Sequence, residues 1–299
     1  MILPFSAVLW AGHALYRAQG FSARTLQAAG RRVLLYERPG AGTGPKVLLV
    51  HGLGGNAASW LKLVPALSRC CSGVAVVDLP GHGRASLVAG EGPLGTVELA
   101  QALGVALAEV AAPGRPVLLV GNSLGGALCL NAAALAPELV AAVVGLSPAG
   151  APLTRAERAA LLRAFGGGRA GGISEMARRL YHRPPRSLWF FSHALTELWG
   201  SPPVQHVLAQ VPDDASPALA PALLEQVAQP ALILWGDSDG ILPASSVPFF
   251  RAHLRNGTVE IIERCGHVPQ LERPEVVGPR IARFVAGLPR APPVRAESA

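Results

Sequence analysis

The sequence predicts a doubly wound α/β fold, in which a mostly parallel sheet is covered on both faces and a helical cap is inserted. Short, continuously apolar strands, such as residues 46–50 and 73–78, alternate with helical stretches. Strands that are apolar on both sides are buried on both faces, as in parallel sheets. The alternation stops between residues 151 and 229 and then resumes. With 299 residues, half of them hydrophobic, the chain can bury one large core.

The first 20 residues are predicted to form a helix. They lack the basic start and the small-residue cleavage site of a secretory signal. Their apolar portion is broken by Pro4 and His13 and is shorter than the ~20 residues that a membrane span needs. Ile2, Phe5 and Leu9 can share one helical face, so the helix either docks on the body of the protein or rests on a lipid surface.

The remaining elements follow in order. Residues 21–28 and 31–38 alternate in polarity around Ala29-Gly30, which predicts a hairpin at a sheet edge. A glycine-rich linker, residues 39–45, leads into the βα pattern. The strands expected there are residues 46–50, 73–78, 116–120, 141–147, 231–235 and 258–263. The helices expected there are residues 59–68, 96–111, 124–136, 245–254 and 274–286.

Residues 151–229 contain no good strand, and their helical stretches are broken by glycine and proline pairs. The last residues are rich in proline and arginine and are expected to fray. The predicted division is therefore an N-terminal helix, a core in two segments, a helical cap and a flexible tail. The N-terminal helix comprises residues 1–20, and the core comprises residues 21–150 together with 230–287. The cap comprises residues 151–229, and the tail comprises residues 288–299.

Composition excludes some function classes. The net charge of +7 comes mostly from scattered arginines, without the basic, aromatic-interleaved runs of a nucleic-acid surface. The charge is interpreted as solvated surface, with attraction to anionic membranes as the lesser alternative. The four cysteines have neither a disulfide framework nor Cys-x-x-Cys metal spacing. We therefore expect a cytoplasmic protein, with peripheral membrane contact through residues 1–20 left open.

Residues 116–126, PVLLVGNSLGG, read as a buried strand, a tight turn at Ser123 and a helix. A serine at the tip of such a turn has strained backbone angles, and Gly121 and Gly125 are needed because side chains there would collide with neighbouring backbone. The amide of Leu124 and the helix dipole can stabilise negative charge on a substrate oxygen. The motif alone is also compatible with a plain glycine-rich turn.

Three other strand-end loops can complete a site, because the carboxyl ends of parallel strands meet at one edge of the sheet. The loop HGLGG, residues 51–55, can present the amide of Leu53 as a second oxyanion donor. Asp237 and Asp239 compete for the role of a histidine-orienting acid. His267 follows a glycine after the last strand and is the candidate base, whereas His51 is expected only to hold its loop.

Taken together, these motifs resemble the α/β-hydrolase family from about residue 21 to residue 286. They occur in the family's order: HGLGG, DLPGHGRAS at residues 78–86, GNSLGG, WGDSDGILP and CGHVPQLERP. The resemblance implies a nucleophilic Ser123, an acid at Asp239, a base at His267 and oxyanion amides at Leu53 and Leu124. It leaves Asp237 as a turn residue and implies no metal or organic cofactor.

Within the family, SPAG at residues 147–150 leading into the cap is similar to carboxylesterases and monoacylglycerol lipases. This implies that a carboxylic ester or lipid with an apolar acyl part is cleaved through an acyl-enzyme. Carbon–carbon bond hydrolases of ring-cleavage products share the GNS-x-GG elbow, but their Gly-Pro-Gly-Ala oxyanion loop is absent and Val268 stands where they carry tryptophan. A non-catalytic binding module is the third alternative.

The cap is dense in aromatic residues in a chain that otherwise has few. Most of them are expected to fasten the cap to the body, and some to line an apolar substrate pocket. The candidates for substrate binding are Trp189, Phe190, Phe191 and Trp199. We expect a small-molecule ester or lipid as the partner and no nucleic acid.

Overall fold

The structure is a computed structural model of the chain. It describes residues 5–28, 30–88, 90–166, 172–186, 188, 192–212 and 218–289. Three of the predicted substrate-binding residues, Trp189, Phe190 and Phe191, lie outside these residues, as does most of the predicted tail.

An eight-stranded sheet forms the centre of the described molecule, with the strand order β1-β2-β4-β3-β5-β6-β7-β8. The strands are β1 (Ser22–Ala28), β2 (Arg31–Pro39), β3 (Val47–Val50), β4 (Gly73–Asp78), β5 (Val117–Asn122), β6 (Val140–Leu146), β7 (Ala231–Gly236) and β8 (Gly257–Ile262). From β4 to β8 all neighbours are parallel, whereas β1 and β2 form an antiparallel hairpin that joins β4 at one edge. The predicted fold class and edge hairpin are confirmed.

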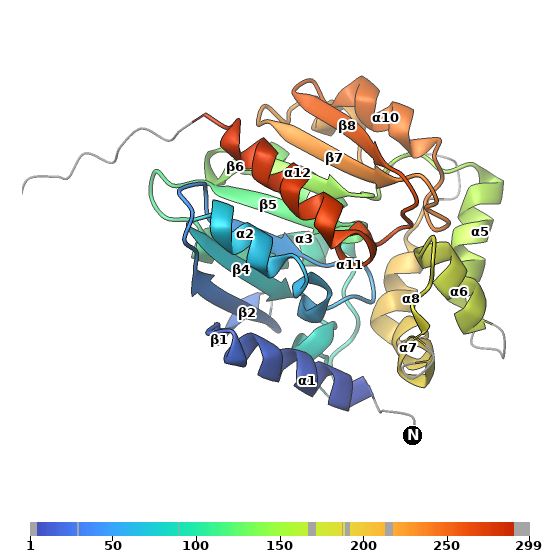
Figure 1. Ribbon diagram of the computed structural model, residues 1–299. Helices are drawn as coiled ribbons and strands as arrows, with labels where there is room; N and C mark the ends of the chain where they lie inside the picture. The colour runs from blue at the N-terminus through green and yellow to red at the C-terminus, as the bar shows by residue number, and fades with distance from the viewer. Residues whose placement is uncertain are drawn as a thin grey trace, which may run out of the picture.

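Helices cover both faces of this sheet (Figure 1). One face packs under α1 (Phe5–Ala18), α2 (Val64–Cys70) and α12 (Pro274–Ala286), and the other under α3 (Thr96–Val110), α4 (Leu124–Leu135), α9 (Pro221–Leu224) and α10 (Ser246–His253). Each face has its own apolar cluster, because the strands of the parallel part are buried on both sides.

In the segment between β6 and β7, the described residues form helices and connecting loops and no strand. The helices are α5 (Arg155–Gly166), α6 (Gly172–Leu180), α7 (Ser192–Trp199), α8 (Pro202–Ala209) and the short α9. Figure 1 shows α5 to α8 grouped beside the ends of the parallel strands. The division of the chain into core and cap stays an interpretation, and we call this segment the cap.

One predicted helix begins later than expected. The sequence predicted a helix over residues 59–68, but a short 3-10 turn, η1 (Ala57–Trp60), precedes α2. The Asn56 side chain accepts a hydrogen bond from the amide of Ala58 and so caps η1. The helix α2 then begins at Val64 with Pro65 in its first turn, a position where the missing N–H of proline does no harm.

The N-terminal helix α1 docks on the body of the protein. Tyr16 is fully buried, donates a hydrogen bond from its hydroxyl to the carbonyl of Ala57, and stacks on Tyr36. Trp10 and Leu15 point away from this contact, with 65% and 51% of their surfaces exposed. No helix in the described part of the chain is long and apolar enough to cross a membrane.

A buried polar cluster supports the loops after β3 and β4. His51 donates from Nδ1 to the carbonyl of Gly52, because its Nε2 accepts from the amide of Leu79. The ring centroids of His82 and His51 lie 5.0 Å apart. The Asp78 carboxyl accepts hydrogen bonds from two backbone amides of the same loops. Burial lowers the pKa of each histidine to about 4 and raises the pKa of Asp78 to about 6.

These pKa values predict that acid destabilises the protein. Each histidine binds a proton near pH 6.5 when unfolded and near pH 4 when folded, so its stabilising contribution is lost as the pH falls between these values. Asp78 acts in the opposite sense and offsets part of the loss. We expect a net loss of about 3 kcal/mol in the free energy of unfolding between pH 6.5 and 4, measured by urea denaturation.

The variant His82→Asn is the control for this prediction, because its amide N–H can still donate to the carbonyl of Pro80 while carrying no titrating group. The pH dependence should become shallower in this variant. An unfolding free energy that stays constant from pH 6.5 to 4 in the parent protein would contradict the assignment.

Candidate active site

Ser123 lies at the tip of a strained turn between β5 and α4. Its backbone has φ of 54° and ψ of −120°, in a region that side-chain-bearing residues rarely occupy. A Cβ at Gly121 would lie 2.2 Å from the carbonyl oxygen of Gly125, and a Cβ at Gly125 would lie 2.3 Å from that of Val50. The predicted need for both glycines is therefore confirmed.

Backbone hydrogen bonds hold the turn in this conformation. The amide of Ser123 donates to the carbonyl of Leu146 in β6, and its own carbonyl accepts from the amides of Ala127 and Ala149. The serine is thus fixed to its own helix, to the next strand and to the loop that begins the cap, so the strained angles are determined from several directions.

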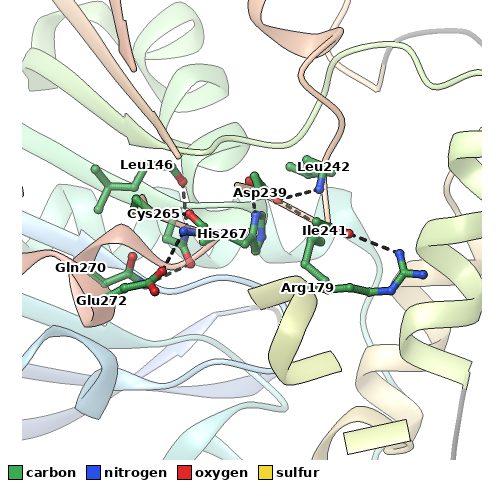
Figure 2. Close-up of polar contacts among 12 residues, drawn as sticks. Leu146, Arg179, Asp239, Ile241, Leu242, Cys265, His267, Gln270 and Glu272 are labelled. Carbon is green, nitrogen blue, oxygen red and sulfur yellow. Dashed lines mark hydrogen bonds and ion pairs between the residues drawn. The ribbon is translucent and has the colours of Figure 1, made fainter. Parts of the chain in front are cut away.

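Asp239 and His267 form a buried pair in the loops after β7 and β8. His267 Nδ1 lies 2.7 Å from Asp239 Oδ2, and only 4% and 1% of the two side-chain surfaces are exposed. Figure 2 shows the two side chains facing each other. A carboxylate can only accept, so Nδ1 carries the hydrogen and Nε2 is left free to take up a proton.

The second carboxylate, Asp237, has a different task. It accepts hydrogen bonds from the amides of Arg264 and Cys265 and from the Ser238 hydroxyl. It therefore shapes the turn that leads to His267 and makes no contact with the imidazole. Asp239 therefore contacts the imidazole and Asp237 contacts the turn, and the assignment of Asp239 as the acid stays a prediction.

Asn122 connects the serine turn to the histidine loop. Its side-chain amide donates to the carbonyls of His267 and Leu146, and its oxygen accepts from the Gln270 side chain. All of these groups are buried. The sequence analysis missed Asn122 and Gln270, although a polar residue next to the predicted nucleophile at the end of an apolar strand, as Asn122 is, is a recognisable signal.

The cap is tied to the acid and base loops through residues 179–183. The amide of His267 donates to the carbonyl of Leu180, and the amide of Gly240 donates to the carbonyl of Arg179. The Arg179 guanidinium in turn donates to the carbonyl of Gly240 (Figure 2). A Cβ at Gly266 would lie 2.3 Å from the carbonyl oxygen of Leu180, so the close approach requires glycine.

The Glu272 carboxylate completes this connection. It accepts from the amide of Gly266 at 2.7 Å, and from the amides of His182 and Arg183 at 3.1 and 2.8 Å. One side chain thus joins the residue before His267 to the chain that follows α6. Charge-assisted hydrogen bonds to backbone amides are stronger than neutral ones, so Glu272 fixes where the imidazole lies.

The predicted oxyanion loops converge on the serine. A Cβ at Gly52 would lie 3.1 Å from the Cβ of Ser123, so the loop after β3 passes directly beside it. Leu53, Ser123 and Leu124 all line one pocket. Within the described chain, neither the Leu53 nor the Leu124 amide has a hydrogen-bond acceptor, and the Leu124 amide is at the N-terminus of α4, where such groups lack partners in the helix.

This pocket has a volume of about 850 Å³ and a mainly aliphatic wall. From the cap it is lined by residues that the sequence analysis missed, namely Leu153, Leu161, Phe165, Val207 and Leu208. Trp199, a predicted substrate-binding residue, is not in this wall, because its indole packs over Gly54 in the oxyanion loop. Among the described residues, no group of three or more His, Cys, Asp or Glu side chains could hold a metal ion.

Residues 45–274 match the family model for the alpha/beta hydrolase fold. The chain belongs to the α/β-hydrolase family. It is 30% identical over 289 residues to the dihydrolipoyllysine-residue acetyltransferase component of the acetoin cleaving system of Pseudomonas putida, covering 90% of this chain and 70% of that protein. It is also 30% identical over 271 residues to the pimeloyl-[acyl-carrier protein] methyl ester esterase of Methylococcus capsulatus, and this match covers 82% of this chain and 96% of that protein.

Among solved structures, the α/β hydrolase is similar to a membrane phospholipase A described as a novel bacterial virulence factor. The TM-score is 0.77 at 25% identity, and the match covers 95% of this chain and 92% of the other. Family membership together with the serine elbow makes the protein a serine hydrolase.

The contacts of Glu272 generate a stability prediction. In the variant Glu272→Ala, three backbone amides lose their acceptor, and we expect the free energy of unfolding to fall by about 2 kcal/mol. The measurement is urea denaturation followed by circular dichroism.

The matched control is Glu275→Ala, because Glu275 lies three residues further along the chain in a surface ion pair with Arg273 and its side chain is 63% exposed. An exposed pair of this kind contributes about 1 kcal/mol or less. Equal losses in the two variants would contradict the role assigned to Glu272.

Proposed function

We propose that the protein hydrolyses carboxylic esters with an apolar acyl part, through an acyl-enzyme formed on Ser123. The observation that carries the proposal is the buried Asp239–His267 hydrogen bond in loops that Asn122 joins to the serine turn. A strained nucleophile, an oriented imidazole and free amides at an apolar pocket are the parts that acyl transfer requires.

In the proposed mechanism the Ser123 hydroxyl attacks the ester carbonyl while His267 Nε2 takes its proton. Asp239 holds the imidazole in the productive tautomer and stabilises the imidazolium. The amides of Leu53 and Leu124 stabilise the oxyanion of the tetrahedral intermediate. His267 then protonates the departing alcohol, and water, deprotonated by the same imidazole, releases the carboxylic acid and regenerates Ser123.

An ester is favoured over a sugar or a charged substrate because the pocket wall is mainly aliphatic. Two of the similar proteins are a methyl ester esterase and a phospholipase, which supports this choice. The alternative within the family is hydrolysis of a carbon–carbon bond in a ring-cleavage product, which the shared elbow motif favours and the sequence of the oxyanion loop disfavours.

The two neighbouring aspartates provide a matched test of the mechanism. In Asp239→Asn the imidazole is held in the wrong tautomer, and we expect kcat for p-nitrophenyl butyrate to fall by about 10⁴. The variant Asp237→Asn instead removes the carboxylate that shapes the turn at residues 264–265. For this variant we expect kcat to fall less than tenfold and the thermal stability to be lower. A larger catalytic loss in Asp237→Asn would contradict the assignment.

Ser123→Ala tests the nucleophile. With retained folding, we expect hydrolysis to fall by at least about 10³ and labelling by a fluorophosphonate probe to disappear. The parent protein should turn over p-nitrophenyl esters faster than a ring-fission dienoate. Preference for the dienoate would select the carbon–carbon hydrolase instead, and tight ligand binding without labelling or turnover would select a binding module.

We also propose that the outer face of α1 makes peripheral contact with anionic membranes. Support comes from the exposed Trp10 and Leu15 on a helix whose inner face is already docked through Tyr16, and from the net charge of +7. The double variant Trp10→Ala, Leu15→Ala should sediment at least tenfold less with phosphatidylserine vesicles. Its activity on soluble esters should be unchanged, and unchanged sedimentation would contradict the contact.

A further inference from the structure

The pocket beside Ser123 continues along the whole length of α4. The pocket wall includes one stripe of this helix with the spacing of a single helical face. The stripe consists of Leu124, Ala127, Leu128, Asn131, Ala132 and Leu135. Since α4 begins at the residue after the nucleophile, one end of the stripe lies at the reacting centre and the other lies about 16 Å away, at 1.5 Å per residue.

The opposite wall is a matching stripe of α3. It consists of Thr96, Val97, Ala100, Gln101, Gly104 and Leu107. Both helices follow parallel strands, so they run in the same direction away from the catalytic edge of the sheet. Gln210, at the end of α8 in the cap, caps the start of α3 by accepting from the amide of Thr96, and it also lines the pocket. The groove therefore opens under the cap and extends outward between α3 and α4.

Small residues keep the groove open. A Cβ at Gly104 would meet nothing within 4 Å, although glycine in the middle of a helix is less stable than alanine. Ala100 on α3 and Ala132 on α4 are likewise short. Each stripe also carries one amide side chain. Gln101 is exposed and Asn131 is half-buried, so both can stay hydrated beside an apolar ligand.

Apolar side chains of the groove are left in contact with water. Val97 and Leu135 line the pocket and are 66% and 69% exposed. Covering such surface with an apolar ligand is favourable, because it removes apolar area from water. The occupant must also be continuous with the carbonyl carbon at Ser123, because the groove and the serine belong to one pocket.

We infer that the α3–α4 groove holds the acyl chain of the substrate and selects long chains. This inference rests on the proposed ester hydrolysis. An extended covalent chain advances ~1.2 Å per atom, so the ~16 Å length of α4 accommodates about 12 to 14 carbons. Gly104 lies eight residues into α3, or ~12 Å along it, and a large side chain there would block the groove beyond about the tenth carbon.

The test is a tryptophan ladder on α3, assayed on p-nitrophenyl esters of 4, 8, 12 and 16 carbons. We expect Gly104→Trp to keep kcat/KM for the butyryl ester within twofold and to lower it at least tenfold for the 12- and 16-carbon esters. Ala100→Trp, one turn nearer the serine, should also impair the 8-carbon ester. Val105→Trp is the control, because Val105 is on α3 but outside the pocket wall, and its chain-length profile should match the parent protein.

Binding separates this inference from the proposed function. In the Ser123→Ala background, calorimetry should detect laurate binding that weakens at least tenfold with Gly104→Trp and is unchanged with Val105→Trp. Gly104→Ala preserves the open groove and keeps the long-chain preference, which controls for loss of the glycine. Unaltered profiles and unaltered laurate binding in Gly104→Trp would overturn the groove, whereas absent hydrolysis of every ester by the parent protein would overturn the function instead.

Discussion

The site depends on the strained backbone of Ser123. A side-chain-bearing residue with φ of 54° and ψ of −120° costs on the order of 1–3 kcal/mol, so it persists only where its surroundings determine it. Here the surroundings do so through two glycines that allow backbone atoms to approach closely, and through three backbone hydrogen bonds to β6, α4 and the start of the cap. The same geometry places the N-terminus of α4 beside the hydroxyl.

From this turn a continuous set of polar contacts leads to the cap. Asn122 joins the turn to the carbonyl of His267, and the amide of His267 donates to the carbonyl of Leu180, the last residue of α6. Glu272 then connects Gly266 to residues 182–183, which follow α6 in the cap. Groups connected in this way do not contribute independently, since displacing one member shifts the others. The cap is thus part of the structure that positions the imidazole of His267.

The sequence was sufficient for the parts of the site that depend on local geometry. The elbow at Ser123, the order of the strand-end loops and the edge hairpin all follow from short-range patterns of glycine and apolar residues. It was insufficient where tertiary packing decides. The contacts of Asn122 and Glu272 join segments up to 148 residues apart, and no local pattern specifies such pairings.

The pocket wall shows the same division. Aromatic density directed attention to Trp199, which packs over Gly54, while aliphatic residues of α5 and α8 supply the wall. An aromatic-rich stretch predicts burial, but it does not tell packing between cap and body from packing against a ligand. Only the fold determines which side of each helix faces the serine.

The helix α4, which Ser123 caps, has small residues on two sides, and they serve two different requirements. On the side facing the sheet, Gly125 and Gly126 allow α4 to approach backbone and Pro148 so closely that a Cβ would collide. On the side facing α3, Ala127 and Ala132 leave an open channel where larger side chains would fill the space between the helices. Close packing on one side fixes the serine, and loose packing on the other provides room for a chain attached to it. Because both features belong to one helix, the direction of the channel is set by the same element that positions the hydroxyl.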